Sequence, residues 1–269
     1  MQPKVRFQAT TLDRKRVEVI ASPIDVLDWA EAVERLRTWA QWRASRYVCI
    51  CNAHSVVTAF QDPPFAEVVR LADMVAPDGA PVAWMMRRMG HPNQQRIDGP
   101  DLMWSFCKAA KEGDPGIFLY GSTDETLRRL EANLLANFPA LRIAGRYAPP
   151  FRELNAQEDD AVVQMINSSG AGIVWVGLGC PKQEIWMAGK KGRIDAVMVG
   201  VGAAFSIHAG NIHRAPLWMR NAGLEWLHRL AREPRRLWRR YLVTNTLFIL
   251  KAAQQLAAHM MSSRTGARG

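Results

Sequence analysis

Residues 172–179 read GIVWVGLG, and residues 195–202 read DAVMVGVG. Both runs are apolar almost throughout, which is typical of strands covered on both faces of a sheet. Four similar runs occur earlier in the chain, and longer helical patterns separate them. This alternation predicts an α/β domain with a mainly parallel, Rossmann-like sheet flanked by helices. The four earlier strands are expected at residues 47–51, 73–77, 116–121 and 141–147.

The chain changes character after Gly210, where two helical stretches follow with no strand between them. Pro234 is unfavourable inside a helix but fits its first turn, so we expect a break at residues 232–234. We therefore predict an α/β domain over residues 1–210 and a helical, arginine-rich appendage over residues 211–269. An N-terminal hairpin is expected in residues 5–20. Helices are expected at 25–43, 54–61, 64–71, 79–89, 100–111, 123–137, 156–168, 181–190, 216–231 and 235–260.

Composition narrows the class of protein. The chain has 269 residues, 48% of them hydrophobic, and a net charge of +10. Such a charge calls for an acidic partner, which can be nucleic acid, phospholipid headgroups or a phosphorylated ligand. Half of the excess lies in residues 218–241, where seven arginines face two glutamates. No run of about 18 apolar residues occurs, so any membrane contact should be peripheral. The N-terminus also lacks the apolar run of a secretory signal.

The four cysteines are scattered, which fits a reducing cytosol rather than a disulfide framework. Cys49 and Cys51 fall on the same face of an expected strand, and we interpret them as small buried hydrophobic residues rather than metal or redox groups. No HExxH, paired CxxC or DxD-type cluster occurs. We therefore expect neither a metal nor a cofactor.

Ligands of open α/β sheets bind at the carboxyl ends of the strands, so the residues after each strand are candidates. Asp78 follows the strand MVAP and can be either a general base or a helix N-cap. The glycines of VGLGCPKQE and VGVGAAF stand where backbone amides can receive phosphate. Neither is a complete GxGxxG, because Lys182 and Phe205 occupy the third position. Gln183 can contact a sugar or a base, or be a solvated helix residue.

Two further groups are interpreted structurally. In RIDGPDL (96–102) we expect Asp101 to act as a cap or turn residue before the next helix. His54 and His208 can be catalytic or structural, and we expect structural roles because each is isolated in a mixed segment.

Together these stretches resemble one family. The segments are CNAHSVV, ADMVAPDGAPVAW, RIDGPDLM, FLYGS, VGLGCPKQEIW, GVGAAFSIHAGNIHRAP and GLEWLHRLAREPRRLWRRYL. In order and spacing, from about residue 47 to 242, they look like the motifs of the WecG/TagA/CpsF glycosyltransferases, glycosyltransferase family 26. The resemblance implies an inverting, metal-independent enzyme that moves a hexose-type sugar from a UDP-sugar to a polyprenyl-diphosphate-linked saccharide. It also implies a place at the inner surface of the cytoplasmic membrane, in exopolysaccharide, capsule or cell-wall synthesis.

The resemblance also assigns roles to residues. Asp78 corresponds to the proposed base of the family. Two departures concern the site: Ile50 stands where many members have threonine, and Ser206 stands where many have an acid. We expect the CNAHS segment and the Ser206 departure to favour an exopolysaccharide-type member with a glucose-like donor. The implied substrate-binding residues are Asn52, Gly79, Arg96, Gly99, Gly179, Gln183, Arg229, Arg236 and Arg239.

Residues 229–242 read RLAREPRRLWRRYL, and here arginines alternate with large apolar side chains. Such a helix suits the headgroup layer of a membrane, where it can lie in plane. We expect Arg229, Arg236 and Arg239 to bind diphosphate and the remaining arginines to face lipid. An apolar edge between domain and appendage can support a homo-oligomer.

Three alternatives stay open beside the transferase. A nucleic-acid-binding protein would use the basic tail but leaves the DGAP and PKQE segments unexplained. A nicotinamide oxidoreductase is disfavoured by the missing third glycine. The third alternative is a non-catalytic adaptor at the membrane surface.

Overall fold

The computed structural model describes residues 14–266, except for the side chains of Arg236, Arg240 and residues 263–266. The described chain begins with a hairpin of β1 (Arg16–Val19) and β2 (Ser22–Asp25). The hairpin lies later than the expected residues 5–20, whose first part is outside the described residues. It turns at Ile20, which has a positive φ of 61°, and continues into the segment where we had expected a helix to begin.

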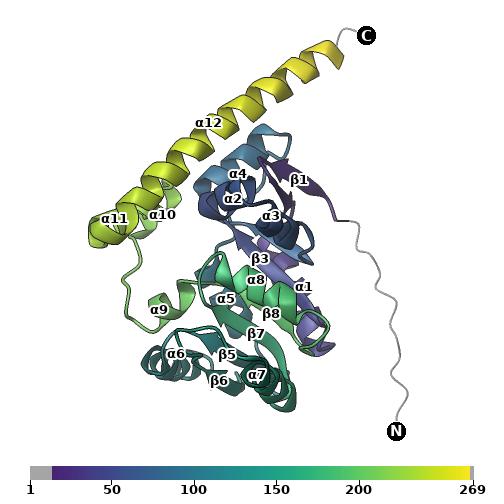
Figure 1. Cartoon of the computed structure of the whole chain (residues 1–269), viewed down its shortest axis with the longest axis vertical. Coiled ribbons are helices and arrows are strands. Elements are labelled where there is room, and N and C mark those ends of the chain that lie inside the picture. The colour runs from purple at the N-terminus through teal and green to yellow at the C-terminus, as the bar shows by residue number, and fades with distance from the viewer. Residues whose placement is uncertain (1–13, 267–269) are drawn as a thin grey trace.

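Six parallel strands form the sheet expected from the apolar runs, in the order β4-β3-β8-β7-β5-β6 (Figure 1). The connections after β3 and after β8 leave toward opposite faces, so the gap between these two neighbours is the topological switch point of the sheet. The strands are β3 (Arg46–Cys51), β4 (Met74–Pro77), β5 (Gly116–Gly121), β6 (Ile143–Tyr147), β7 (Ala171–Gly177) and β8 (Val197–Gly200).

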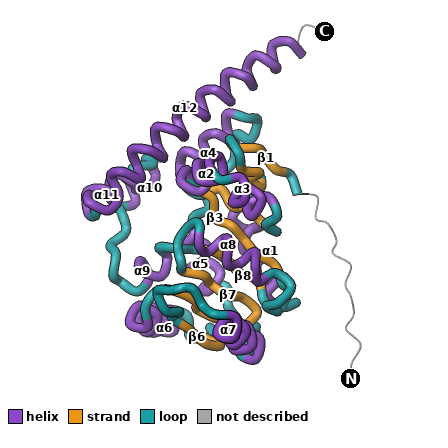
Figure 2. Tube along the Cα trace, in the orientation of Figure 1, coloured by secondary structure: helices purple, strands orange, loops and turns teal. Residues whose placement is uncertain are grey.

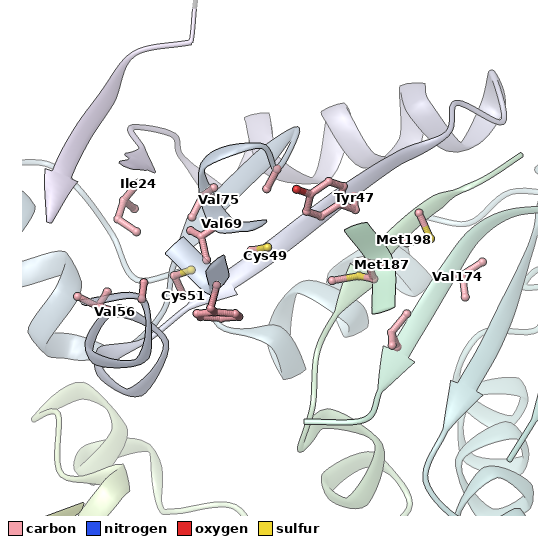
Figure 3. Packing of buried hydrophobic residues seen from close by; sticks show 14 of the residues in the cluster. Ile24, Tyr47, Cys49, Cys51, Val56, Val69, Val75, Val174, Met187 and Met198 are labelled. Carbon is pink, nitrogen blue, oxygen red and sulfur yellow. The ribbon is translucent and has the colours of Figure 1, made fainter. Parts of the chain in front are cut away.

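Side chains alternate between two buried faces, which is why the strands look continuously apolar in sequence. In β3, Tyr47, Cys49 and Cys51 enter one core, drawn in Figure 3, while Val48 and Ile50 enter the other. The reading of the two cysteines as buried hydrophobic residues is confirmed, and burial raises the pKa of both thiols. Helices α2 (Ala53–Gln61), α3 (Pro63–Arg70), α4 (Gly79–Arg88), α7 (Ala156–Ser168) and α8 (Lys182–Lys190) contribute to the first core, and α1 (Trp29–Gln41), α5 (Gly99–Lys108), α6 (Asp124–Asn137) and α9 (Ala204–His208) to the second.

The C-terminal part is helical, as expected, but its first stretch divides (Figure 2). One helix was expected over residues 216–231, whereas α10 (Leu217–Asn221) and α11 (Glu225–Arg232) are separate. Gly223 lies between them with a φ of +73°, and a Cβ there would come within 2.7 Å of the Ala80 Cβ. The chain therefore bends where it passes closest to α4. The break before Pro234 is confirmed, because α12 (Pro234–Gly266) begins at that residue.

One face of α12 packs on α2 and on the hairpin (Figure 1). Phe248 and Ala252 are buried there, and full burial of a large apolar side chain stabilises by about 1.5–3 kcal/mol. The Gln255 side chain adds two hydrogen bonds, accepting from Ile20 N at 2.9 Å and donating to Glu18 O at 2.7 Å. These contacts hold α12 against the α/β part of the chain.

The solvent-facing side of α12 carries large apolar side chains. Trp238, Leu242, Ile249 and Leu250 are 48%, 61%, 65% and 54% exposed. Trp238, Leu242 and Ile249 are spaced by four and seven residues, so they share one side of the helix. In residues 14–266 no helix is long and apolar enough to cross a membrane.

Candidate active site

A cavity of about 410 Å³ opens at the switch point of the sheet. Its walls come from the segments that follow β3, β4, β7 and β8, as expected for the carboxyl ends of parallel strands. Residues of α11 and α12 close the remaining side. The cavity therefore lies between the predicted domain and the predicted appendage. Among the implied site residues, Asn52, Asp78, Gly79, Arg96, Gly99, Gly179, Gln183 and Arg229 all line it.

Asp78 occupies the N-cap position of α4, but its side chain makes no capping hydrogen bond. Instead its Oδ2 accepts from Asn52 Nδ2 at 3.4 Å. The Asn52 amide is oriented from behind, because its Oδ1 caps α2 by accepting from His54 N at 3.0 Å and Ser55 N at 3.3 Å. The sequence left two roles open for Asp78, general base and helix N-cap, and the structure excludes a side-chain cap. The carboxylate is left directed to the cavity with one amide donor.

The surroundings of Asp78 favour its protonated form. Burial, followed by the nearby Asp98 carboxylate, raises the pKa of Asp78 from 3.8 to about 7. Arg96 and the Asn52 hydrogen bond oppose this rise, and Glu225 adds to it. A carboxylate is most effective at accepting a proton from a substrate hydroxyl when its pKa lies near the working pH. The carboxyl is ionised above about pH 7, so base catalysis by Asp78 requires that range.

The capping role that the sequence indicated for Asp101 belongs to Asp98. Asp98 caps α5 by accepting from Asp101 N at 3.0 Å, so the cap expected at Asp101 was wrong. The position is set by the helix start at Gly99, which the sequence reading placed one residue later. Asp98 also accepts from Arg96 Nη2 at 2.9 Å and from Arg214 Nη2 at 2.7 Å. Burial raises the pKa of Asp98, and Arg214 opposes that rise.

Asp101 instead joins the α/β part to the C-terminal helices. Its Oδ2 accepts from Arg214 Nη2 at 3.1 Å and from Arg220 Nη2 of α10 at 2.5 Å. Glu225 in the first turn of α11 accepts from Arg96 Nη1 at 3.2 Å. The sequence pattern predicts no individual role for Arg214, Arg220 or Glu225. The HRAP and GLEW segments carry opposite charges, but the hydrogen-bond partners of Arg214, Arg220 and Glu225 lie more than 100 residues away in the chain.

Gln183 holds two glycine turns together. Its Oε1 accepts from Gly179 N at 3.2 Å and from Gly202 N at 3.1 Å, and its Nε2 donates to Glu184 Oε1 at 2.9 Å. Two backbone amides that were candidates for phosphate binding are thus already engaged. Burial raises the pKa of Glu184, whose Oε2 has no hydrogen-bond partner. The direct substrate contact foreseen for Gln183 stays a prediction, although the residue does line the cavity.

Glycines make room at the floor of the cavity. Gly79 has a φ of +77°, in the region that side chains rarely adopt, and it directly follows Asp78. A Cβ on Gly99 would lie 3.2 Å from Val201 O, so Gly99 lets α5 approach the end of β8. Both positions line the cavity, and the substrate binding implied for them stays a prediction. Ile50 and Ser206, the two departures from the family pattern, also line the cavity.

The arginines of the C-terminal part divide into different environments. Arg229 lines the cavity, its Nε is buried without a hydrogen-bond partner, and it forms no ion pair in the described part of the chain. Arg239 does not line the cavity, and its guanidinium lies 5.2 Å from the centre of the exposed Trp238 ring. The side chain of Arg236 lies outside the described residues. The structure therefore brings Arg229 to the site and leaves Arg239 at the surface.

The two histidines have different surroundings. His208 stacks on Trp104 at 5.0 Å, and its Nε2 is 2.9 Å from Pro100 O. Burial lowers the pKa of His208, and these contacts confirm the expected structural role. His54 lines the cavity at the start of α2. Within residues 14–266, no group of three or more His, Cys, Asp or Glu residues is arranged to hold a metal ion.

The fold and the cavity define a Rossmann-like α/β enzyme, whose cavity is lined by a carboxyl with a pKa raised to about 7 and by an arginine. The chain belongs to the glycosyl transferase WecG/TagA/CpsF family, whose pattern it matches over residues 17–261. This confirms the resemblance and identifies the chain as a glycosyltransferase.

Two relatives share this class. The chain is 30% identical over 227 residues to a Bacillus spizizenii N-acetylglucosaminyldiphosphoundecaprenol N-acetyl-beta-D-mannosaminyltransferase, covering 82% of this chain and 86% of the relative. The enzyme of the same name from Bacillus subtilis is 30% identical over 192 residues, covering 71% and 73%.

Proposed function

We propose that this enzyme transfers a hexose-type sugar from a UDP-sugar to a polyprenyl-diphosphate-linked saccharide, with inversion at the anomeric carbon. The relatives named above act on an undecaprenyl-diphosphate-linked acceptor, which supports the acceptor class. The observation that carries the proposal is the pairing, in one cavity, of the near-neutral Asp78 carboxyl with the ion-pair-free Arg229. Asp78 supplies a base, and Arg229 supplies a fixed positive charge. Surface polysaccharide synthesis is the process such a product would serve.

The proposed reaction is a single displacement. The ionised Asp78 takes the proton of the acceptor hydroxyl, whose oxygen forms a bond to the anomeric carbon. The bond from that carbon to the UDP oxygen breaks on the opposite side, and UDP leaves with the electron pair. Attack and departure on opposite faces invert the anomeric centre. The departing diphosphate gains negative charge, which a permanently charged guanidinium can receive through two parallel hydrogen bonds.

Arg229 is the diphosphate ligand that the geometry supports best. Arg96, Arg214 and Arg220 are also near the site, but each donates to carboxylates. A charged group without a partner in a cavity favours an anionic ligand, because burial of an unpaired charge is costly. We propose that this arginine, rather than a divalent cation, stabilises the leaving diphosphate. Arg236 and Arg239 stay predictions as further ligands.

Binding of UDP tests the function directly. We expect calorimetry on the full chain, without added Mg²⁺, to give a dissociation constant of about 1–100 µM for UDP, which is a free energy of roughly −5.5 to −8 kcal/mol. Addition of EDTA should leave the titration unchanged. Absence of UDP binding would contradict the transferase and leave the membrane-surface adaptor. Salt-dependent binding of DNA with no UDP binding would instead favour the nucleic-acid-binding protein.

The donor sugar follows from turnover. UDP-glucose and UDP-N-acetylmannosamine should be compared on a short lipid-diphosphate acceptor, with the anomeric configuration of the product read by NMR. Turnover of UDP-glucose would agree with the donor expected from the sequence. Turnover of UDP-N-acetylmannosamine alone would place this enzyme with its two Bacillus relatives, and retention of configuration would contradict the single displacement.

We also propose that the exposed face of α12 lies on the inner surface of the cytoplasmic membrane. Trp238, Leu242 and Ile249 share this face, and Arg235 and Arg239 are exposed at its N-terminal end. Apolar side chains flanked by arginines suit an interfacial helix, and each basic residue near an anionic leaflet adds about 1 kcal/mol. A membrane-bound acceptor gives the enzyme a reason to be there.

Vesicle sedimentation tests the membrane proposal. The double substitution Leu242→Glu and Ile249→Glu should weaken binding to vesicles that contain an anionic phospholipid by tenfold or more, since each side chain loses about 1.5–3 kcal/mol of burial. Gln254→Glu is the control, because this exposed residue lies on the same helix to the side of the apolar stripe. Equal weakening by the control would attribute the effect to charge alone. Undiminished binding of the double variant would contradict the proposal.

A further inference from the structure

Arg96 is held between two carboxylates that come from different parts of the molecule. Its Nη2 donates to Asp98 Oδ2 at 2.9 Å, and its Nη1 donates to Glu225 Oε2 at 3.2 Å. Asp98 precedes α5 in the α/β part, whereas Glu225 is the first residue of α11. All three side chains line the same cavity as Asp78. The place that Arg96 takes beside the base thus depends on the docking of α11.

We propose that Glu225 is a positioning residue that holds Arg96 away from Asp78, so that this carboxyl serves as the base only while α11 is docked. The inference rests on the proposed function and concerns how the base of that same site is regulated. Glu225 is itself fixed from a second side, because Arg214 Nε lies 3.7 Å from its Oε1. Arg214 also donates to Asp98 at 2.7 Å. The two carboxylates and two guanidiniums therefore form one closed arrangement across the junction.

The physical reason lies in what Arg96 would do without Glu225. An arginine within about 4–6 Å of a carboxylate lowers the carboxyl pKa by about one to three. Arg96 already opposes the raised pKa of Asp78, and Glu225 supports it. Loss of the Glu225 charge removes that support and frees one end of the guanidinium. Both changes lower the pKa of Asp78, and both weaken it as a base.

Other titratable or charged groups share the cavity with Asp78, and they come from every element around it. His54 belongs to α2, Cys180 precedes α8, Arg229 belongs to α11 and Tyr241 to α12. Substitution of Glu225 by glutamine leaves all of them in place. The substitution removes the Glu225 charge itself and one partner each of Arg96 and Arg214, so a background without Arg96 is needed to separate these effects.

The test is the pH dependence of kcat/KM for the full chain with Glu225→Gln. For a base with a pKa of about 7 the ratio of kcat/KM at pH 8 to that at pH 6 is about tenfold, and for a pKa of about 6 it is about twofold. We expect the ratio to fall from the first value toward the second. Glu233→Gln is the control, because Glu233 carries the same charge at the other end of α11 and does not line the cavity. This variant should keep the wild-type ratio. Lower activity with an unchanged ratio would show a merely structural role and overturn the proposal.

Two further variants complete the test. Glu225→Asp retains the charge and should retain most of the wild-type ratio. In an Arg96→Gln background, Glu225→Gln should change the ratio by less than half as much as in the wild type, because its main route is gone. An equal change in both backgrounds would overturn the role of Arg96.

Binding of UDP keeps the two proposals distinct. A wild-type chain that neither binds UDP nor transfers sugar would contradict the proposed function itself. A wild-type chain that binds and transfers, beside a Glu225→Gln variant with an unchanged pH ratio, would overturn this inference alone. Calorimetry on the variant shows whether the cavity is intact, since folded Glu225→Gln should bind UDP within about threefold of the wild type.

Discussion

Replacement of Asp78 by asparagine is expected to lower kcat by about 10²–10⁴-fold, which corresponds to about 3–5 kcal/mol of barrier. Asparagine keeps the shape of the side chain and its contact with Asn52, but it cannot take a proton. The loss should therefore appear in kcat, with UDP binding retained in calorimetry. Asp28→Asn is a matched control, because Asp28 is the exposed N-cap of α1 and asparagine caps equally well. Residual activity above one tenth would contradict the assignment of the base.

The same substitution should make the protein more stable. The pKa of Asp78 is raised from 3.8 to about 7, so the folded chain holds this proton more tightly than the unfolded chain. Ionisation therefore costs stability as the pH rises from about 4 to 7, and the cost stays in full above pH 7. Asparagine removes it, and because Asp78 lines an open cavity we expect a gain of about 1–3 kcal/mol at pH 8. Denaturant unfolding at pH 8 and at pH 4 checks this, because the gain should vanish at the lower pH.

Replacement of Arg229 by alanine is expected to lower kcat/KM by about 10²–10³-fold, as for loss of one preorganised contact to a developing anion. The residue lines the cavity with its Nε buried and unpartnered, so its loss removes charge that other side chains do not replace. Arg229→Lys should recover only part of the rate, since lysine lacks the paired donors of a guanidinium. UDP binding and turnover on a soluble acceptor analogue are the measurements.

Two other arginines make the test specific. Arg232→Ala is the control, because Arg232 is exposed in the last turn of α11 and does not line the cavity. Arg239→Ala distinguishes the substrate-binding role implied by the resemblance from the surface position seen in the structure. A loss comparable to that of Arg229 would support the role implied by the family, whereas an unchanged rate on the soluble analogue would agree with its place over Trp238. An Arg229→Ala chain with wild-type turnover would remove the proposed diphosphate ligand.

The helices and strands of the α/β part were largely predictable, because their signals are local. Each expected strand is present, since burial on both faces makes a run apolar whatever its neighbours are. The bend at Gly223 was not predictable from the local sequence, because it depends on the close approach of Gly223 to Ala80, 143 residues earlier in the chain. The five-residue α9 is too short to show a helical period. Both failures concern contacts or lengths that a local pattern does not contain.

The sequence by itself determined that the candidate site lies where β3, β4, β7 and β8 end, because parallel strands bring their carboxyl ends to one edge. It also placed Asp78 and Gln183 there. Only the tertiary structure decided that the Asp78 side chain makes no capping hydrogen bond and has a pKa raised to about 7. It also decided that Arg229 lines the cavity with a buried Nε that has no hydrogen-bond partner, whereas Arg96 donates to two carboxylates. The reason is that the strength of a charge interaction depends on distance and burial in space, whereas a sequence pattern records only order along the chain.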